Sequence, residues 1–169
     1  MKIGIIGPNT ISLASEEDIE ARKKLLTIVA DLVALSRNEI VLTPDQNSLL
    51  EYFGKEYIKN NGSKIWIVAP DKEDDVKDYL NLEIGEIISC ERWECQPSKF
   101  NRSCDMFICL GYSGGVLSEI GASKYFNPKK ILIIEEFISS RLPSEINENI
   151  DIEYISLEKL KYHLDLIVK

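Results

Sequence analysis

Short, continuous apolar runs alternate along the chain with segments in which apolar residues recur every three or four positions. Continuous runs are typical of strands that are buried on both faces, whereas the longer spacing is typical of helices with one buried face. Gly, Pro and Asn residues follow many of the runs and indicate turns. The pattern predicts strands over residues 3–6, 39–42, 64–69, 84–89, 105–110, 130–135 and 151–155. It predicts helices over residues 15–36, 49–58, 73–79, 116–125 and 157–168, and a short helix after the irregular segment 90–102.

This order repeats a strand–helix unit about five times. Alternation of this kind produces right-handed crossovers and a parallel sheet. We therefore predict a single α/β domain spanning residues 1–169, with a doubly wound, mostly parallel sheet flanked by helices in a Rossmann-like arrangement. Because ligands of such sheets bind beyond the carboxyl ends of the strands, the loops of interest are residues 7–10, 43–46 and 111–115.

Composition and charge restrict the classes of partner. The chain has 169 residues, of which 44% are hydrophobic and 28% are charged, and its net charge is −8. This acidic balance argues against the nucleic-acid backbone as the main partner, because phosphate binding needs an excess of Lys and Arg. A small phosphorylated ligand is still compatible, since it needs only one local positive site. No apolar stretch approaches the ~18 residues of a membrane span, and the expected location is the cytoplasm.

The titratable residues that often bind metals or act as nucleophiles form no recognisable pattern. Cys90, Cys95, Cys104 and Cys109 match no common zinc spacing, and Cys109 lies in an apolar run that predicts a core position. The single histidine, His163, falls in the last predicted helix and is expected at the surface or in a dimer contact. A Ser-His-Asp arrangement cannot be built around it, and we predict neither a metal site nor a resident cofactor.

The loop after the fifth strand carries the clearest functional signal. Gly111, Tyr112, Ser113, Gly114 and Gly115 separate this strand from a helix. Glycines let the backbone approach a ligand closely, and the amide groups at a helix start bind anions readily. A second hydroxyl, on Ser118, and the carboxylate of Glu119 follow within the first turns.

Glu119 is predicted to face the mouth of the site, where a carboxylate can hold ribose hydroxyls or stabilise or attack an anomeric carbon. The alternative is that the glycines only form a tight turn. In that case Glu119 is a solvated helix residue, paired with Lys124.

Two other loops offer ligand contacts. Gly7, Asn9, Thr10 and Ser12 follow the first strand and either contact a ligand or cap a helix. The segment is not a dinucleotide-binding fingerprint, because G-x-G-x-x-G is absent and a proline removes an amide that pyrophosphate would use. Asp45 follows the second strand and either holds a ribose hydroxyl or forms a turn after proline.

Aromatic and basic residues complete the predicted site. Trp93 and Tyr112 have faces suited to stacking on a nucleobase, although packing alone would also explain Trp93. Arg92 and Arg102 are the candidates for a positive charge beside a phosphate.

The residues of this loop resemble those of a known Rossmann-like superfamily. Gly115 and Glu119 match the Pro-Gly-Gly-x-Gly-Thr-x-x-Glu pattern of the Lonely-guy (lysine-decarboxylase-like) phosphoribohydrolases, whose Arg-Lys pair is replaced here by Gln96-Pro97. The run 117–120, Leu-Ser-Glu-Ile, is similar to that of molybdenum-cofactor carrier proteins. More distantly, the run 119–122, Glu-Ile-Gly-Ala, resembles the helix that carries the nucleophilic Glu of nucleoside deoxyribosyltransferases.

The resemblance implies a nucleotide-like small-molecule ligand and a homodimer or larger homo-oligomer. Two hypotheses for the function follow. In the first, Glu119 cleaves an N-glycosidic bond while Ser113 and the amides of Gly114 and Gly115 hold phosphate. In the second, the protein is a non-catalytic carrier or sensor of a nucleotide or a pterin-type cofactor. A site that has decayed in an oligomer-forming protein is a third possibility.

Overall fold

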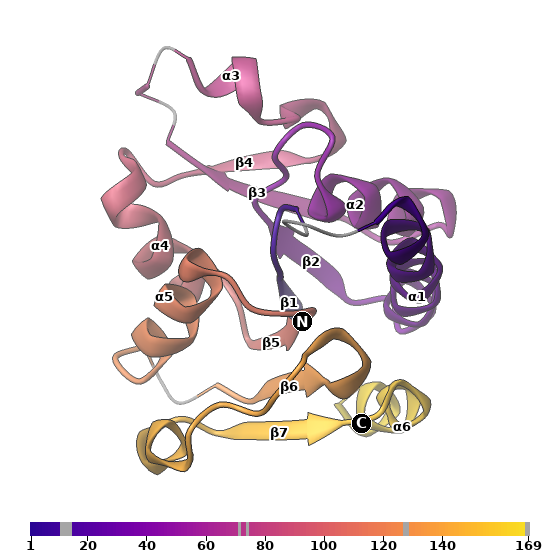
Figure 1. Ribbon diagram of the computed structural model, residues 1–169. Helices are drawn as coiled ribbons and strands as arrows, with labels where there is room; N and C mark the ends of the chain where they lie inside the picture. The colour runs from indigo at the N-terminus through magenta and orange to yellow at the C-terminus, as the bar shows by residue number, and fades with distance from the viewer. Residues whose placement is uncertain (11–14, 71, 74, 127–128, 168–169) are drawn as a thin grey trace.

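A parallel sheet forms the centre of the computed structural model, which describes residues 1–10, 15–70, 72–73, 75–126 and 129–167. Within these residues the sheet has seven strands in the order β4-β3-β2-β1-β5-β6-β7, and every neighbouring pair is parallel (Figure 1). The strands are β1 (Lys2–Ile6), β2 (Glu39–Leu42), β3 (Ile65–Ala69), β4 (Glu86–Ser89), β5 (Met106–Cys109), β6 (Ile131–Ile134) and β7 (Ile152–Ile155). The predicted α/β, parallel, Rossmann-like fold is confirmed.

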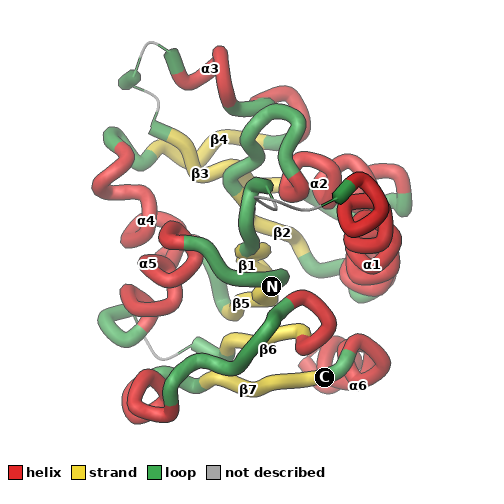
Figure 2. Tube along the Cα trace, viewed as in Figure 1, coloured by secondary structure: helices red, strands yellow, loops and turns green. Residues whose placement is uncertain are grey.

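Helices cover both faces of the sheet, as Figures 1 and 2 show. One face is covered by α1 (Glu16–Leu35), α2 (Leu49–Lys59) and α6 (Leu157–Ile167), and the other by α4 (Gln96–Ser103) and α5 (Gly114–Ser123). Successive side chains of each strand point to opposite faces. Ile3 and Ile5 of β1 therefore join the core beneath α1 and α2, while Ile6 joins the core beneath α4 and α5. This double burial explains the continuous apolar runs in the sequence.

Serine residues mark the starts of the helices that bear on the site. The hydroxyl of Ser15 accepts a hydrogen bond from Asp18 N, and the Asp18 side chain accepts one in return, which is a complete capping box. Ser48 caps α2 in the same way through Glu51 N, and Ser113 caps α5 through Val116 N. At the other end of α2, Asn61 adopts a φ of 59°, a left-handed conformation that asparagine tolerates.

The region before β4 differs from the prediction. The helix expected over residues 73–79 is only α3 (Val76–Tyr79), and part of the expected range, Asp74, lies outside the described residues. The Glu73 carboxylate accepts a hydrogen bond from Trp93 N at 3.4 Å, a contact that ties it to a distant loop. The fourth strand begins two residues later than predicted because Leu82–Ile84 form a 3-10 turn that the Asn81 side chain caps. Tertiary contacts therefore override the local pattern here.

The described helices include none that is both long and apolar enough to cross a membrane. The predicted end of the last helix at Val168 lies outside the described residues.

The strand order places a crevice beside β1. The chain moves outward from β1 through β2 and β3 to β4, and then returns to place β5 on the other side of β1. The loops that follow β1 and β5 therefore leave the sheet toward opposite faces and separate at its carboxyl edge. Such a reversal of strand order is where parallel sheets bind ligands.

A substitution at Gly4 in β1 would test how closely the residues beneath this crevice are packed. A Cβ atom at Gly4 would lie 2.6 Å from Phe107 Cδ1 and 2.9 Å from Phe100 Cε1. We expect Gly4→Ala to lower the free energy of unfolding by about 1–3 kcal/mol, because neither the strand nor α4 can move away without losing contacts. Urea unfolding followed by circular dichroism measures this change.

Gly121→Ala is the matched control, because no atom lies within 4 Å of a Cβ built at this exposed helical position. It should raise stability by about 0.5–1 kcal/mol through helix propensity alone. Equal effects of the two substitutions would contradict the packing described for Gly4.

Candidate functional site

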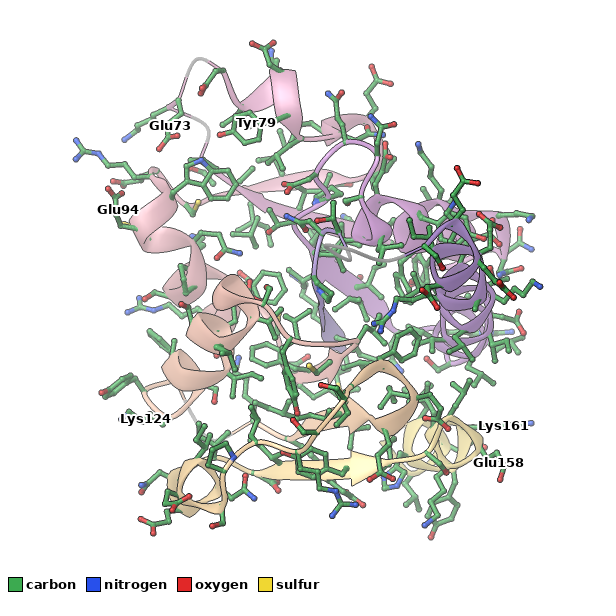
Figure 3. All side chains as sticks on the ribbon, viewed as in Figure 1. Glu73, Tyr79, Glu94, Lys124, Glu158 and Lys161 are labelled. Carbon is green, nitrogen blue, oxygen red and sulfur yellow. The ribbon has the colours of Figure 1, made fainter. Side chains whose placement is uncertain are left out.

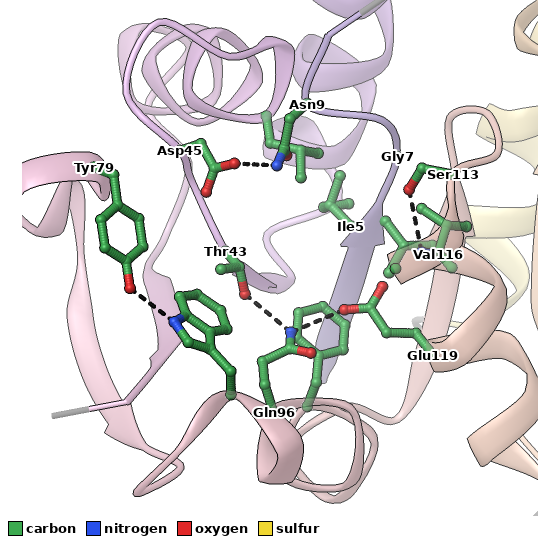
Figure 4. Close-up of a pocket in the computed structure, with 15 residues that line it drawn as sticks. Ile5, Gly7, Asn9, Thr43, Asp45, Tyr79, Gln96, Ser113, Val116 and Glu119 are labelled. Carbon is green, nitrogen blue, oxygen red and sulfur yellow. Dashed lines mark hydrogen bonds between the residues drawn. The ribbon is translucent and has the colours of Figure 1, made fainter. Parts of the chain in front are cut away.

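A cavity of about 340 Å³ lies at the carboxyl edge of the sheet, over the ends of β1, β2 and β5 (Figure 4). Its volume falls in the range of about 300–1,000 Å³ that is usual for small-molecule sites. Described residues that line it are Ile5, Ile6, Gly7, Asn9, Thr43, Asp45, Leu50, Tyr79, Trp93, Gln96, Phe100, Ser113, Gly115, Val116 and Glu119. The cavity thus combines an apolar floor with a small number of polar side chains.

The Asp45 side of the cavity is held by contacts between three loops. Asn9 Nδ2 donates a hydrogen bond to Asp45 Oδ2, and Asn9 O accepts one from Leu49 N at 3.0 Å. Asp45 O in turn accepts from Ser48 N at 3.1 Å, and Asp45 forms an isolated antiparallel bridge with Leu80. The start of α2 therefore fixes both Asn9 and Asp45 at the rim. Sequence analysis proposed both residues, and the structure brings them into contact.

Glu119 lies on the opposite side of the cavity from Asp45 (Figure 4) and is only 9% exposed. Gln96 Nε2 donates one hydrogen bond to Glu119 Oε1 at 2.9 Å and another to Thr43 Oγ1 at 3.2 Å. The Thr43 hydroxyl donates to Val68 O at 3.0 Å, so it must accept from Gln96. This chain of bonds orients the Gln96 amide with its NH₂ group toward the carboxylate. Glu119 is thus a positioned, buried group.

Lys124, the alternative partner of Glu119, points outward from the end of α5 (Figure 3). Its Nζ atom lies 4.8 Å from the centroid of the Tyr125 ring. The interpretation of Glu119 as a solvated residue paired with Lys124 is therefore wrong.

Burial changes the acidity of both carboxyl groups. It raises the pKa of Glu119 from 4.5 to about 7, against the smaller opposing effect of the Gln96 hydrogen bond. Burial also raises the pKa of Asp45, and the hydrogen bond from Asn9 partly offsets this. A carboxyl group with a pKa near neutrality exchanges protons readily at physiological pH, which is a property of many catalytic acids and bases.

Two aromatic side chains form one wall of the cavity. Trp93 Nε1 donates a hydrogen bond to the Tyr79 hydroxyl at 2.7 Å, and the ring centroids lie 5.9 Å apart (Figure 4). Pairing the indole N–H within the protein leaves the ring surface for apolar contact. Trp93 therefore lines the cavity, and its stacking on a base stays a prediction.

The start of α5 forms the remaining wall. The Ser113 hydroxyl accepts a hydrogen bond from Val116 N at 3.3 Å and so serves as the helix cap. Gly115 lines the cavity beside it, whereas Gly114 does not. The preceding Gly111 has a φ of 119°, a backbone conformation that L side chains rarely adopt. This turn allows β5 to lead directly into a helix whose first turn borders the cavity.

Several residues proposed from the sequence lie away from this cavity. Tyr112 packs against the core beneath α4 and α5, where its hydroxyl interacts with Tyr154. Ser118 is exposed, and its hydroxyl donates to Gly114 O at 3.0 Å. Thr10 is exposed and lines a neighbouring cavity between α1 and α2, while Ser12 lies outside the described residues.

The two arginines proposed for phosphate binding do not line the cavity either. Arg92 is exposed at the start of a 3-10 turn, and the guanidinium of Arg102 lies 5.2 Å from the centroid of the Phe126 ring. Among the described residues, no Lys or Arg side chain lines the cavity at all. The charged side chains that the described part of the chain contributes to the cavity are the carboxylates of Asp45 and Glu119.

Nothing in the described part of the chain indicates a metal site. Its His, Cys, Asp and Glu side chains form no cluster of three or more that could hold a metal ion. Cys109 is fully buried in the core, as predicted. His163 lies on α6 with Nε2 3.5 Å from Glu153 Oε1, and 14% of its side chain is exposed; its predicted role in a dimer contact stays a prediction.

Gln96, Thr43, Tyr79 and Phe100 line the cavity although none of them was proposed as a ligand contact. Gln96 had a signal, because it stands where the phosphoribohydrolases carry a basic pair. Thr43 also had one, since it follows a predicted strand at the carboxyl edge. Tyr79 and Phe100 had none, because only the packing of α3 and α4 against the sheet edge brings them to the cavity.

Solved structures share this fold over almost the whole chain. The molybdenum cofactor binding protein from the phototrophic bacterium Rippkaea orientalis matches with a TM-score of 0.74 at 18% identity, covering 99% of this chain and 97% of that one. The Moco carrier protein from Chlamydomonas reinhardtii matches with a TM-score of 0.75 at 10% identity, covering 99% and 96%. Neither a protein-family model nor a curated protein matches the sequence. The fold that the resemblance implies is confirmed.

The raised pKa of Glu119 predicts a pH-dependent stability. Because the unfolded chain ionises this group near its ordinary pKa of 4.5 and the folded chain only near 7, the group favours folding at low pH. That stabilisation is lost as the pH rises toward the folded pKa. Glu119→Gln cannot ionise at this position. The free energy of unfolding of the variant, measured relative to wild type, should therefore increase by about 2 kcal/mol when the pH is raised from 5 to 8. Urea unfolding at both pH values tests this, and a constant difference between the proteins would refute it.

Proposed function

We propose that this chain binds a nucleotide-like ligand in the cavity and cleaves its N-glycosidic bond with Glu119. The single observation that carries the proposal is the position of the Glu119 carboxylate. The carboxylate is buried at the edge of the cavity floor, and a hydrogen bond from Gln96 orients it. It lies across the cavity from Asp45 (Figure 4). Such a carboxylate has a clear task beside a sugar, because it can stabilise the positive charge that develops at the anomeric carbon.

The other lining residues suit the rest of such a ligand. The base fits against the Trp93 and Tyr79 wall, and the free oxygen of Asp45 is a suitable acceptor for a ribose hydroxyl. Glu119 then attacks the anomeric carbon. The base leaves with the electrons of the broken C–N bond and takes a proton from water. A second water hydrolyses the sugar–Glu119 ester and restores the carboxylate.

A second candidate function is that of a non-catalytic carrier. Two proteins with the same fold are named as a molybdenum cofactor binding protein and a Moco carrier protein. In addition, the presence of Gln96 where the phosphoribohydrolases have a basic pair favours binding without their chemistry. In this case the cavity holds a nucleotide or a pterin-type cofactor as cargo, and Glu119 accepts hydrogen bonds from it.

Assembly is a further part of the proposal. The homodimer or larger homo-oligomer that the family resemblance implies stays a prediction, which sedimentation velocity would test.

One assay separates the two functions. The protein is incubated with a panel of nucleosides and nucleoside monophosphates, and released base is measured by chromatography. For the enzyme we expect release that falls at least about 100-fold in Glu119→Gln, because the isosteric amide cannot stabilise the cationic sugar. Glu158→Gln, an exposed carboxylate on α6, is the control and should keep full activity.

The same panel is tested for thermal stabilisation of the protein, with a pterin added. Stabilisation without base release supports the carrier and contradicts the enzyme. Absence of both responses across the panel rejects both functions.

A further inference from the structure

We propose that the ligand of this cavity is an uncharged nucleoside, and that a 5′-phosphate on the same ligand weakens its binding. The inference rests on the proposed function, because it takes a nucleoside-like ligand in the cavity as given. It adds the class of ligand, and it departs from the phosphate site that sequence analysis placed at Ser113, Gly114 and Gly115.

The side chains that line the cavity give it a negative charge. Asp45 and Glu119 line it from opposite sides, and no described Lys or Arg joins them. A phosphate in this space would face two carboxylates with no cation between them. Phosphate sites normally pair the anion with Arg, Lys or several convergent backbone amides.

Two lysines of the neighbouring cavity are paired with carboxylates. Lys23 and Lys55 line the neighbouring cavity of about 390 Å³, which shares Asn9 with the site. Lys23 Nζ lies 2.9 Å from Glu20 Oε1, and Lys55 Nζ lies 2.9 Å from Glu51 Oε1. Each lysine is therefore paired with a carboxylate on its own helix.

Arg22, which reaches the segments after β5 and β6, is used within the fold. Its Nη1 atom lies 3.2 Å from Phe137 O and 3.5 Å from Leu110 O. This contact ties α1 to the segments after β5 and β6, and the side chain does not line the cavity. It therefore offers no positive charge to a ligand there.

The first turn of α5 offers little positive charge to offset the two carboxylates. Ser113 satisfies two of its amides, because Val116 N donates to the Ser113 hydroxyl and Leu117 N to the Ser113 carbonyl. Of the remaining glycine amides, only that of Gly115 belongs to a residue that lines the cavity. A helix start corresponds to roughly half a positive charge, against two carboxylates.

The hydrogen-bonding groups point to the same ligand. One oxygen of Asp45 accepts from Asn9 and one oxygen of Glu119 accepts from Gln96, while the second oxygen of each accepts no hydrogen bond from a described residue. The Asn9 and Gln96 amides direct their NH₂ groups at these carboxylates rather than at a ligand. The cavity therefore presents acceptors, which suit the hydroxyl and amino groups of a nucleoside.

Isothermal titration calorimetry at pH 8 tests the inference with adenosine, guanosine, cytidine and uridine, and with the 5′-monophosphate of each. At this pH Glu119, with a pKa of about 7, is largely ionised. For whichever base binds, we expect the nucleoside to bind at least about tenfold more tightly than its monophosphate, since a dianion and two carboxylates repel each other in a partly buried site.

Two further measurements identify the cause. Raising the salt concentration should reduce the ratio of the nucleoside affinity to the monophosphate affinity, because screening weakens charge repulsion but not shape recognition. Asp45→Asn keeps the Asn9 contact but removes one charge. It should reduce the ratio of the nucleoside affinity to the monophosphate affinity by at least about threefold. Glu158→Gln, the distant control, should leave it unchanged.

The outcomes are distinct. Equal or tighter binding of the monophosphate would overturn this inference and leave the proposed function standing. A preference for the nucleoside that responds neither to salt nor to Asp45→Asn would also overturn it, since charge would not be the cause. Binding of neither form would reject the proposed function together with this inference.

Discussion

The parallel sheet must be covered on both faces, and this requirement decides where the site lies. Helices α1 and α2 cover one face and α4 and α5 cover the other, so the chain has to reverse its direction of winding beside β1. At this point the loops after β1 and β5 diverge and leave a crevice. The close packing of α4 on β1, which requires Gly4, brings Gln96 and Phe100 to the same place.

One side-chain amide connects this architecture to chemistry. Gln96 Nε2 bonds to Thr43 at the end of β2 and to Glu119 on α5, so it joins segments that are far apart in the sequence. The contact holds the carboxylate in the cavity without neutralising it, because an amide donates a hydrogen bond but carries no charge. A lysine or arginine in its place would pair with Glu119 and lower its pKa. Because Gln96 is neutral, it does not offset the negative charge of an ionised Glu119.

Much of the fold was predictable because it follows from local patterns. Apolar runs identify every described strand, and a capping serine marks the start of α1. The predicted start of α5 is two residues late, because the prediction assigns Ser113 to a ligand rather than to the helix cap. The segment 73–84 was poorly predicted, since Glu73 and Asn81 bond to distant or turn-forming groups that the helical pattern does not reveal. The candidate site shows the same division. Gly7, Asn9 and Asp45 lie at predicted loops and Glu119 on a predicted helix. The positions of Arg92, Arg102 and Tyr112 instead depended on which way α4 and the loop after β5 turn.

The sequence by itself determined the alternation of strands and helices, the net charge and the glycine-rich loop that leads to Glu119, because each of these is set by neighbouring residues. Only the tertiary structure decided that Glu119 is buried against Gln96, that Trp93 and Tyr79 form one wall, and that the described residues give the cavity two carboxylates but no Lys or Arg. These properties arise from side chains that converge from five separate segments. Their distances depend on how the helices pack on the sheet, and no local pattern specifies that packing.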